Sequence, residues 1–592
     1  MSTQLQSIIQ QAFTYTQKAN FGRAKPLFEY ILKIQPKNFD ALHAMGFICG
    51  IENNHQEAFN YSLRALKIKP DDLEVNINCA KALQAIGRHS DSLKYHEKAI
   101  FLSPNNHKVW LGCGKSLQCL KRYDDAIAHY DKALSLDPEF AGAWSNKGDI
   151  LNELRCYDDA IAHFDKALSL DPEFAGAWSN KGMSLYELKR YKDAITHYDN
   201  ALNLAPEFAE AWSNKGNVLN KLKHYEEAIA HYDKALSLKP DYAEAWSNKG
   251  NVLNELKRFD EAIDHYDKAL SLNPNYHEAS WNKSLTLLLQ GCFESGLPLY
   301  ESRWVSEKVS ESAGKRIFDK PTWLGVDSLA GKTILIYGEQ GLGDFIQFCR
   351  YVKLVSDLGA KVILETPQAL AGLLGNLEGV SELVIEGEEL PFFDYQCPLL
   401  SLPLACKTNL DTIPNPSRYI NLDNYPNKII NWKAKLGSKL KPRVGLVWSG
   451  NPRHKNDHNR SILLRDILPF LPNQFEYVSL QKEVREIDKL TLDSNPHILN
   501  FASYLHDFLD TAALIDNLDL VISVDTSVAH LGGALGKKTL LLLPYVPDWR
   551  WLLDRDDSPW YSAMKLYRQT SIGDWNSVLD KMKSDLSGTK IL

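Results

Sequence analysis

Residues 141–174 read AGAWSNKGDILNELRCYDDAIAHFDKALSLDPEF, and residues 175–208 read AGAWSNKGMSLYELKRYKDAITHYDNALNLAPEF. Tryptophan, glycine, proline and several alanines stand at matching places in the two stretches. A fixed period of this length is typical of stacked helical hairpins, because each unit buries the same faces against its neighbours. Proline keeps the same interval over a much longer part of the chain: Pro36, Pro70, Pro104, Pro138, Pro172, Pro206, Pro240 and Pro274.

The repeated residue types indicate how each hairpin packs. Gly148 and Gly182 let two antiparallel helices approach closely, and Phe164 and Tyr198 fill the space between units. Proline then ends the second helix, because it cannot continue it. The pattern resembles the tetratricopeptide repeat, which implies an all-α solenoid over residues 5–310, with eight repeats and a ninth, partial repeat as its cap.

One polar residue keeps the same register without belonging to the apolar set. It is an asparagine in six units: Asn78, Asn146, Asn180, Asn214, Asn248 and Asn282. In the tetratricopeptide segment of eukaryotic protein O-GlcNAc transferases, asparagines at a similar position line the concave surface and hold a peptide. The resemblance therefore implies a peptide groove. Duplication of the whole SNKG block would give the same series without a function, and the sequence leaves both explanations open.

A different pattern follows a stretch at 311–330, which we assign to a linker. Short β-branched runs alternate with helical patterns, at 333–337, 361–365, 382–385, 443–447, 475–480 and 518–524. Such alternation predicts parallel sheets covered by helices. We therefore expect an α/β half with two Rossmann-like lobes, at 331–426 and 442–592, joined by a lysine-rich junction at 427–441.

The loops after these strands are the expected ligand sites, because open α/β sheets bind ligands at the carboxyl ends of their strands. The first lobe supplies a glycine-rich turn with Gly338, Gly341, Gly343 and Asp344, and the second supplies Asp525, Thr526, Ser527 and His530. A helix N-terminus has unpaired N–H groups that suit a diphosphate, and hydroxyl groups add donors. Asp344, Asp525 and Thr526 would also serve as ordinary helix caps.

A third loop, at 448–461, carries Ser449 together with Arg453, Lys455 and Arg460, whose charges suit a leaving phosphate. Four segments of this half resemble glycosyltransferase family 9, the family of the ADP-heptose heptosyltransferases, in its bacterial branch fused to tetratricopeptide repeats. They are GEQGLGDFIQFCRYV, PLLSLP, VGLVWSGNP and DLVISVDTSVAHLGGALGKKTLLLLPYVPDWRW. The resemblance covers roughly residues 316–592 and implies a GT-B fold.

The resemblance also implies a reaction, namely metal-independent, inverting transfer of a sugar from a nucleoside-diphosphate donor. Asp344 matches the family's acceptor base. Asp525, Thr526 and His530, with Ser527 beside them, match its donor-binding motif, and Ser449 with Lys455 or Arg460 matches it less closely. The nucleotide sugar would be a co-substrate, so no cofactor is implied.

The sequence does not identify the acceptor of the sugar, and three interpretations follow from it. The first lobe, 331–426, is short, which suggests that the repeats select a protein or peptide acceptor. A second interpretation keeps the transfer but makes the acceptor a glycan or lipid-linked saccharide, with the repeats as a docking module. A third treats the chain as a non-catalytic scaffold for protein–protein interaction, since a fold does not fix a function.

The composition limits the partners and the cellular compartment that we expect for this protein. The formal net charge is −7 over 592 residues, which gives no broad attraction to nucleic acid. The nine cysteines are scattered, without a CxxC pair, which argues against a zinc site or a disulfide framework. No basic leader and no run of about 18 apolar residues is present. We therefore expect a cytoplasmic protein without a bound metal, a nucleic-acid partner or an integral membrane segment.

Overall fold

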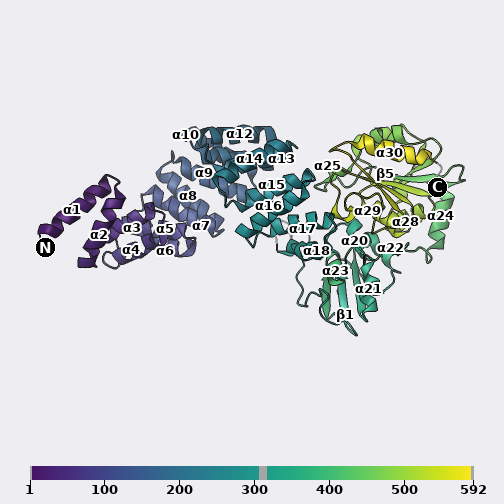
Figure 1. Cartoon of the computed structure of the whole chain (residues 1–592), viewed down its shortest axis with the longest axis horizontal. Helices are drawn as coiled ribbons and strands as arrows, with labels where there is room; N and C mark the ends of the chain where they lie inside the picture. Colours follow the sequence, from purple (N-terminus) through teal and green to yellow (C-terminus); the bar gives the residue numbers. More distant parts are fainter. Residues whose placement is uncertain (1–2, 306–315, 589–592) are drawn as a thin grey trace. The chain divides into compact units, whose positions relative to one another are not determined.

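The computed structural model describes residues 3–305 and 316–588, and the chain divides into two compact units, Met1–Pro240 and Asp241–Leu592 (Figure 1). The division falls inside the stretch 5–310 assigned above to one solenoid. The domain bounds drawn from the sequence stay a prediction.

The first unit consists of antiparallel helix pairs, as the 34-residue period predicts. The pairs are α1 (Thr3–Gln17) with α2 (Phe21–Ile34), α3 (Phe39–Ile51) with α4 (His55–Leu66), α5 (Leu73–Ala85) with α6 (His89–Leu102), α7 (His107–Cys119) with α8 (Tyr123–Leu136), α9 (Ala141–Glu153) with α10 (Tyr157–Leu170), α11 (Ala175–Glu187) with α12 (Tyr191–Leu204), and α13 (Ala209–Lys221) with α14 (Tyr225–Leu238).

The repeated glycines make the close approach of each pair possible. A Cβ atom at Gly182 would lie 2.9 Å from Cε1 of Tyr198, and one at Gly216 would lie 2.8 Å from Cε1 of Tyr232. Contacts this short do not occur between ordinary side chains, so any larger residue would push the two helices apart. The aromatic ring of the second helix therefore occupies the space that glycine leaves on the first.

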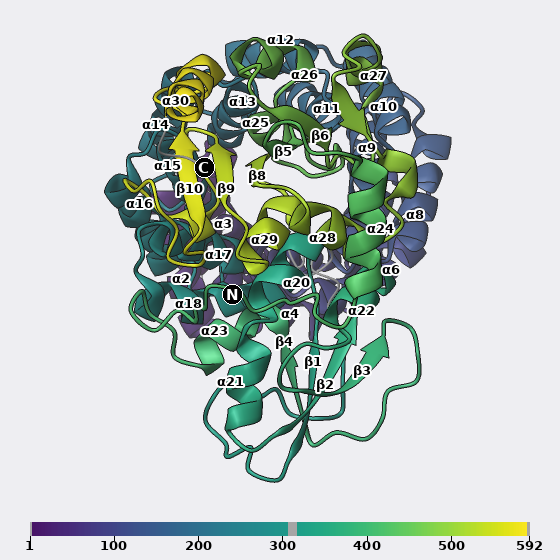
Figure 2. The same cartoon turned by 90° about the vertical axis from the view of Figure 1, so that its right-hand side faces the viewer.

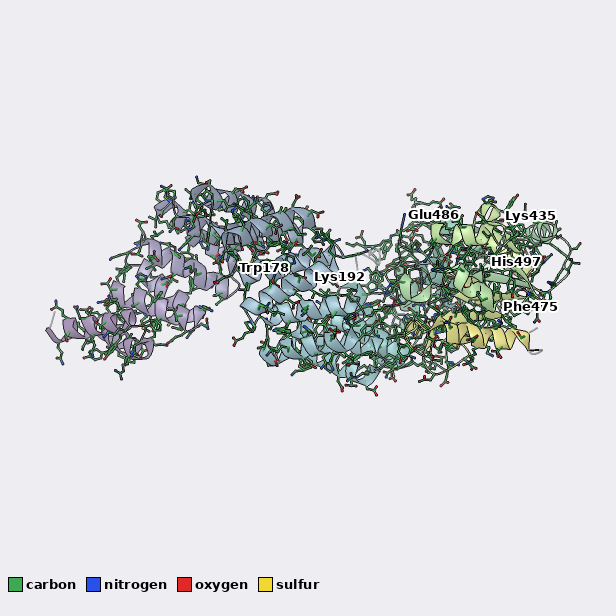
Figure 3. The ribbon with its side chains drawn as sticks, turned by 90° about the horizontal axis from the view of Figure 1, so that it is seen from above. Trp178, Lys192, Lys435, Phe475, Glu486 and His497 are labelled. Atoms are coloured by element: carbon green, nitrogen blue, oxygen red, sulfur yellow. The ribbon has the colours of Figure 1, made fainter. Side chains whose placement is uncertain are left out.

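The tryptophan that recurs in the repeats from Trp110 onward belongs to the packing. Trp178, on α11, is labelled in Figure 3. Its Nε1 donates to the carbonyl oxygen of Pro172 at 2.9 Å, and its ring lies 5.3 Å from that of His197 on α12. The same donor and ring contacts recur at Trp110, Trp144 and Trp212. These bonds fix the start of each first helix against the turn before it.

The second unit begins with two more helix pairs and continues into the α/β part. The pairs are α15 (Ala243–Glu255) with α16 (Phe259–Leu272) and α17 (His277–Leu289) with α18 (Phe293–Tyr300), and a short 3-10 helix, η1 (Glu301–Trp304), follows. Of the predicted linker at 311–330, residues 311–315 lie outside the described residues. Residues 316–330 lie along the first sheet, where the backbone N–H of Trp323 donates to the carbonyl oxygen of Gln396 at 2.8 Å.

Two parallel sheets form the α/β part (Figure 2). The first has the order β3-β2-β1-β4, with β1 (Thr333–Tyr337), β2 (Lys361–Thr366), β3 (Val380–Ile385) and β4 (Tyr395–Pro398). The second has the order β10-β9-β8-β5-β6-β7, with β5 (Arg443–Val447), β6 (Glu476–Ser479), β7 (Ile498–Asn500), β8 (Leu520–Val524), β9 (Thr539–Leu543) and β10 (Met564–Arg568).

Helices connect these strands. Those of the first sheet are α20 (Leu342–Phe348), α21 (Tyr351–Asp357), α22 (Gln368–Leu374), η2 (Leu399–Ser401) and α23 (Leu402–Ala405), and α24 (Pro426–Leu436) occupies most of the predicted junction. Those of the second are α25 (Asp457–Arg460), α26 (Leu464–Ile467), η3 (Leu468–Phe470), α27 (Glu486–Asp493), η4 (Ala502–Tyr504), α28 (Phe508–Asp516), α29 (Ser527–Ala534), η5 (Trp549–Trp551) and α30 (Trp575–Ser587).

The prediction of parallel sheets is confirmed, and all six predicted strands are present. Four further strands, β4, β7, β9 and β10, had not been recognised. Across the described residues, none of the helices combines the length and the apolar character needed to span a membrane.

One hydrophobic core joins the last helix pair to both sheets. It contains Phe293 of α18, Ile334 of β1 and Val521 of β8, all of them buried. The ring of Phe293 lies 6.0 Å from that of Trp549, and the ring of Tyr300 lies 6.1 Å from the same tryptophan. The partial repeat that we expected to cap the solenoid is therefore built into the α/β part.

Candidate functional site

Asp344 lies at the start of α20, directly after the glycine-rich turn that leaves β1. Its Oδ2 accepts a hydrogen bond from the backbone N–H of Gly341 at 3.1 Å, so the capping role considered from the sequence is present. Gly338 makes the turn possible, because a Cβ atom there would lie 2.7 Å from the ring of Phe345. The bond to Gly341 occupies one carboxylate oxygen and leaves Oδ1 for other partners.

The second group of predicted residues follows β8. Asp525 directly follows Val524, the last residue of the strand, Thr526 is the N-cap residue of α29, and Ser527 is the first residue of that helix. The Thr526 side chain does not cap the helix; its Oγ1 lies 3.1 Å from Oγ of Ser523 instead. His530 is buried, with Nε2 at 3.9 Å from Oδ1 of Asp525 and Nδ1 hydrogen-bonded to the hydroxyl of Tyr561 at 2.9 Å.

The structure brings these two groups together. Helix α20 lies beside α29 in Figure 2, at the place where the two sheets approach each other. A Cβ atom at Gly343 would lie 2.9 Å from Cδ2 of His530 and 3.3 Å from Cα of Ser527. The last glycine of the turn is therefore needed for a direct contact between the two lobes, and Asp344 stands next to that contact.

The third loop contributes Ser449 and Arg460 to the same region. Ser449 is buried two residues after the end of β5, and Gln481 holds its backbone, with Nε2 donating to the Ser449 carbonyl oxygen at 2.9 Å. Arg460 Nη1 donates to the carbonyl oxygen of Asp525 at 3.0 Å. Lys455 is exposed on this loop. Of Lys455 and Arg460, the two cations matched to the family's donor site, Arg460 is the one that the structure joins to Asp525.

The sequence left open whether the segment around Arg550 shapes the donor pocket or packs the carboxyl-terminal helix, and it gave Asp548 no role. Arg550, on η5, places Nη2 at 2.5 Å from Oδ1 of Asp344 and Nη1 at 2.8 Å from Oδ1 of Asp548. The Arg550 side chain is only 7% exposed, so this ion pair links the two lobes in a largely water-free setting. The segment follows the carboxyl end of β9, the edge at which open α/β sheets bind their ligands.

Burial has the largest effect on the pKa values of the titratable groups in the site. It raises the pKa of Asp344, and the guanidinium of Arg550 opposes that rise. Burial and the nearby Asp548 carboxylate raise the pKa of Asp525 to about 6, against the opposing effect of Arg460. Burial and the neighbouring Arg550 hold the pKa of His530 well below its usual range, so its imidazole is neutral at pH 7. His530 is therefore a hydrogen-bonding group and not a cation.

A metal site was not expected from the sequence. Within residues 3–305 and 316–588, no group of three or more His, Cys, Asp or Glu side chains is arranged to hold a metal ion. The positive groups near Asp525 are the guanidinium groups of Arg460 and Arg550 and the N-terminus of α29.

The ladder asparagines all lie on first helices of their pairs and are half-buried: Asn78 on α5, Asn146 on α9, Asn180 on α11, Asn214 on α13, Asn248 on α15 and Asn282 on α17. Asn180 Nδ2 donates to Oδ1 of Asp149 at 2.6 Å, in the preceding repeat. Asn146 Nδ2 is buried and finds no partner among the described residues. The members of the series therefore have different surroundings, and at least Asn180 has a packing role.

Comparison with known proteins supports the assignment of tetratricopeptide repeats. Models of the tetratricopeptide repeat match residues 114–177, 182–223, 209–242 and 243–276. Protein FlbA of Caulobacter vibrioides is 25% identical over 332 residues, which cover 51% of this chain and 53% of FlbA. The chain thus spans about half the length of this curated relative.

Two solved structures illustrate the likeness. The Cut9–Hcn1 hetero-tetramer of the APC/C is 21% identical, with a TM-score of 0.38, over 47% of this chain and 55% of that one. YrrB, described as a tetratricopeptide protein with an unusual peptide-binding site, is 26% identical, with a TM-score of 0.26, over 32% of this chain and 98% of that one. The chain carries tetratricopeptide repeats, which indicate protein or peptide binding, followed by a domain with parallel sheets.

Proposed function

We propose that this protein is a glycosyltransferase of the two-lobed GT-B type, which moves a sugar from a nucleoside-diphosphate donor to an acceptor bound by its repeats. The observation that carries the proposal is the contact between Gly343 and His530. It joins the strand-end loop that holds Asp344 to the strand-end loop that holds Asp525. A substrate bound between two such loops meets an acid–base group from one sheet and a helix N-terminus from the other.

The donor half of the reaction is supported by the groups around α29. Its N-terminal N–H groups, together with the hydroxyls of Thr526 and Ser527, suit the oxygens of a diphosphate. Arg460 adds a positive charge at Asp525. Together they would stabilise the charge that develops on the departing diphosphate, a task for which other enzymes use a divalent ion.

The acceptor half is supported by Asp344. In this mechanism its carboxylate takes the proton of an acceptor hydroxyl while that oxygen attacks the anomeric carbon. The bond from the anomeric carbon to the phosphate oxygen breaks on the opposite face, and the diphosphate leaves with the bonding pair. The configuration of the sugar is therefore inverted.

Nucleotide-sugar binding tests this proposal. We expect one member of a panel of ADP-, GDP-, UDP- and dTDP-sugars to bind the full chain in calorimetric titrations that contain EDTA. Thr526→Val should weaken that binding by about tenfold, because one hydroxyl donor to the diphosphate is lost. Thr196→Val, which changes an exposed hydroxyl bonded to its own helix, is the matched control and should have no effect. A panel without a single binder would contradict the proposed function.

The peptide groove requires its own test, since a glycan acceptor would not use it. A peptide selected on the full chain from a random display library should lose at least about tenfold in affinity when Asn78, Asn146 and Asn214, all in the first unit, are changed to Ala. The expected loss corresponds to a few backbone hydrogen bonds of about 0.5–1.5 kcal/mol each. Asn60→Ala, on the exposed side of α4, serves as the control. Unchanged affinity in the triple variant would favour duplication of the SNKG block as the origin of the series.

A further inference from the structure

Arg550 connects the two lobes through the group that we assign as the base. Its guanidinium lies between Asp344 of the first lobe and Asp548 of the second, at 2.5 Å and 2.8 Å. The guanidinium favours the ionised form of this carboxyl group and also covers one of its oxygens. In the arrangement seen here, the oxygen of Asp344 that does not cap the glycine turn is occupied by Arg550.

The surroundings of Arg550 contain buried donors without acceptors. These are Nε of Arg550, Nε of Arg460 and Oγ of Ser449, none of which finds a hydrogen-bond partner among the described residues. Ser449 is 2% exposed and Arg550 is 6% exposed. An unsatisfied buried donor costs about 1–3 kcal/mol. Three of them on two separate loops, 448–461 and the segment of η5, therefore indicate a site for a ligand that is rich in acceptor oxygens.

These donors belong to one region of the second unit. A Cβ atom at Gly450 would lie 2.7 Å from Nη2 of Arg460, so this arginine rests against the residue that follows Ser449. Arg460 and Arg550 both act on Asp525, where their charges lower its pKa. The ligand that these donors fit is anionic, because two guanidinium groups lie near enough to Asp525 to lower the pKa of its carboxyl, and a phosphate accepts from both prongs of an arginine fork.

We propose that Arg550 exchanges partners during the reaction: it pairs with Asp344 while the site is empty, and it pairs with the diphosphate of the donor once that group has bound. The inference rests on the proposed function. It makes Arg550 a ligand of the donor and a positioning residue for the base, and it couples the two halves of the site through one side chain.

The exchange would change the strength of the base. The charged and titratable groups that face Asp344 among the described residues are Arg550, Asp548, His454 and Tyr300, and the Gly341 N–H donates to its carboxylate. Burial and Asp548 raise the pKa of Asp344, whereas Arg550 lowers it. When Arg550 turns to the diphosphate, its lowering effect weakens and the pKa of Asp344 rises further. Asp344 would thus become a stronger base, with an uncovered oxygen, only when a donor is present.

A double-mutant cycle with inorganic pyrophosphate tests the exchange without any sugar transfer. We expect Arg550→Met to weaken pyrophosphate binding by roughly tenfold to a hundredfold, the range for a charge-assisted hydrogen bond. Asp344→Asn should tighten binding by about threefold to tenfold, because Arg550 no longer has to leave a carboxylate. In the double variant this gain should disappear. Calorimetry on the full chain in EDTA measures all four dissociation constants.

Two further variants serve as controls for the charge and the fold. Arg550→Lys retains the charge and should recover part of the affinity, which also covers the case in which the Met variant is poorly folded. Arg555→Met changes an arginine of the same segment that pairs with Asp557, and it should leave binding within about twofold. If Asp344→Asn tightens binding equally in the Arg550→Met background, the carboxylate repels the anion directly and the exchange is wrong. Failure of every form to bind pyrophosphate would also overturn it, whereas the nucleotide-sugar panel judges the proposed function separately.

Discussion

Asp344→Asn is expected to lower the rate of sugar transfer by roughly a hundredfold to ten-thousandfold, the usual contribution of a positioned general base. The amide has nearly the same shape as the carboxylate but cannot accept the acceptor's proton. Donor binding should not weaken, since the loss affects the chemical step and not the diphosphate site. Single-turnover release of nucleoside diphosphate, measured with the donor found by calorimetry, separates these two effects.

The control for this prediction is Asp357→Asn. Asp357 is an exposed residue at the end of α21 that pairs with Lys353, and its replacement should leave the rate unchanged. The pH dependence gives a second check. The base must be deprotonated, so the rate should fall as the pH drops through the pKa of Asp344, which burial places above the ordinary aspartate range near 4. An Asp344→Asn variant that keeps the full transfer rate would remove Asp344 from the mechanism and favour the scaffold interpretation.

The fold was predictable wherever a period or a strand run was strong. The 34-residue repeat predicts the helix pairs, because each pair must bury the same small and aromatic residues. The missed strands lacked such a signal. β7 is three residues long, and β9 reads TLLLL, an apolar run whose leucines fit a buried helix as well as a strand. β4 ends at a proline, which weakens its strand pattern.

The sequence predicted which residues of each loop belong to the site, but not the contacts between residues of different loops. Residues that follow strands, such as Asp344 and Asp525, could be named, because the carboxyl ends of parallel strands bind ligands. Their partners could not, since an ion pair between Asp344 and Arg550 depends on how two separate lobes pack. The same holds for Ser449 and Arg460: the sequence shows one loop, whereas the structure shows which of its cations reaches Asp525.

The packing of the last repeat against the glycine-rich turn shows this limit most clearly. Arg303, on η1, is fully buried, and its guanidinium donates to Glu301 at 2.6 Å, to Glu339 at 3.0 Å and to Ser401 at 2.7 Å. Glu339 is a residue of the glycine-rich turn, and its Oε1 also accepts from the backbone N–H of Leu400 at 3.2 Å. A residue of the repeats thus neutralises a carboxylate two residues before Gly341.

Arg303→Met is therefore expected to destabilise the second unit by about 3–5 kcal/mol, the cost of leaving buried carboxylates without their counter-charge. Lys489→Met, which breaks an exposed pair with Glu486, should cost no more than about 0.5 kcal/mol. Urea titrations of the full chain, read by hydrogen–deuterium exchange of peptides from the second unit, give both values. A loss below about 1 kcal/mol for Arg303→Met would mean that the cluster is hydrated or protonated and does not depend on the arginine.

The loss caused by Arg303→Met should also depend on pH. Burial raises the pKa of Glu339 to about 7, so this group takes up a proton on folding, and its contribution to stability declines as the pH rises from its unfolded value towards 7. Without Arg303 the pKa of Glu339 rises further, and the decline continues above pH 7. The difference in stability between the two proteins should therefore be smallest near pH 5 and grow through pH 8, and a constant difference would show that the variant loses packing and not a charge partner.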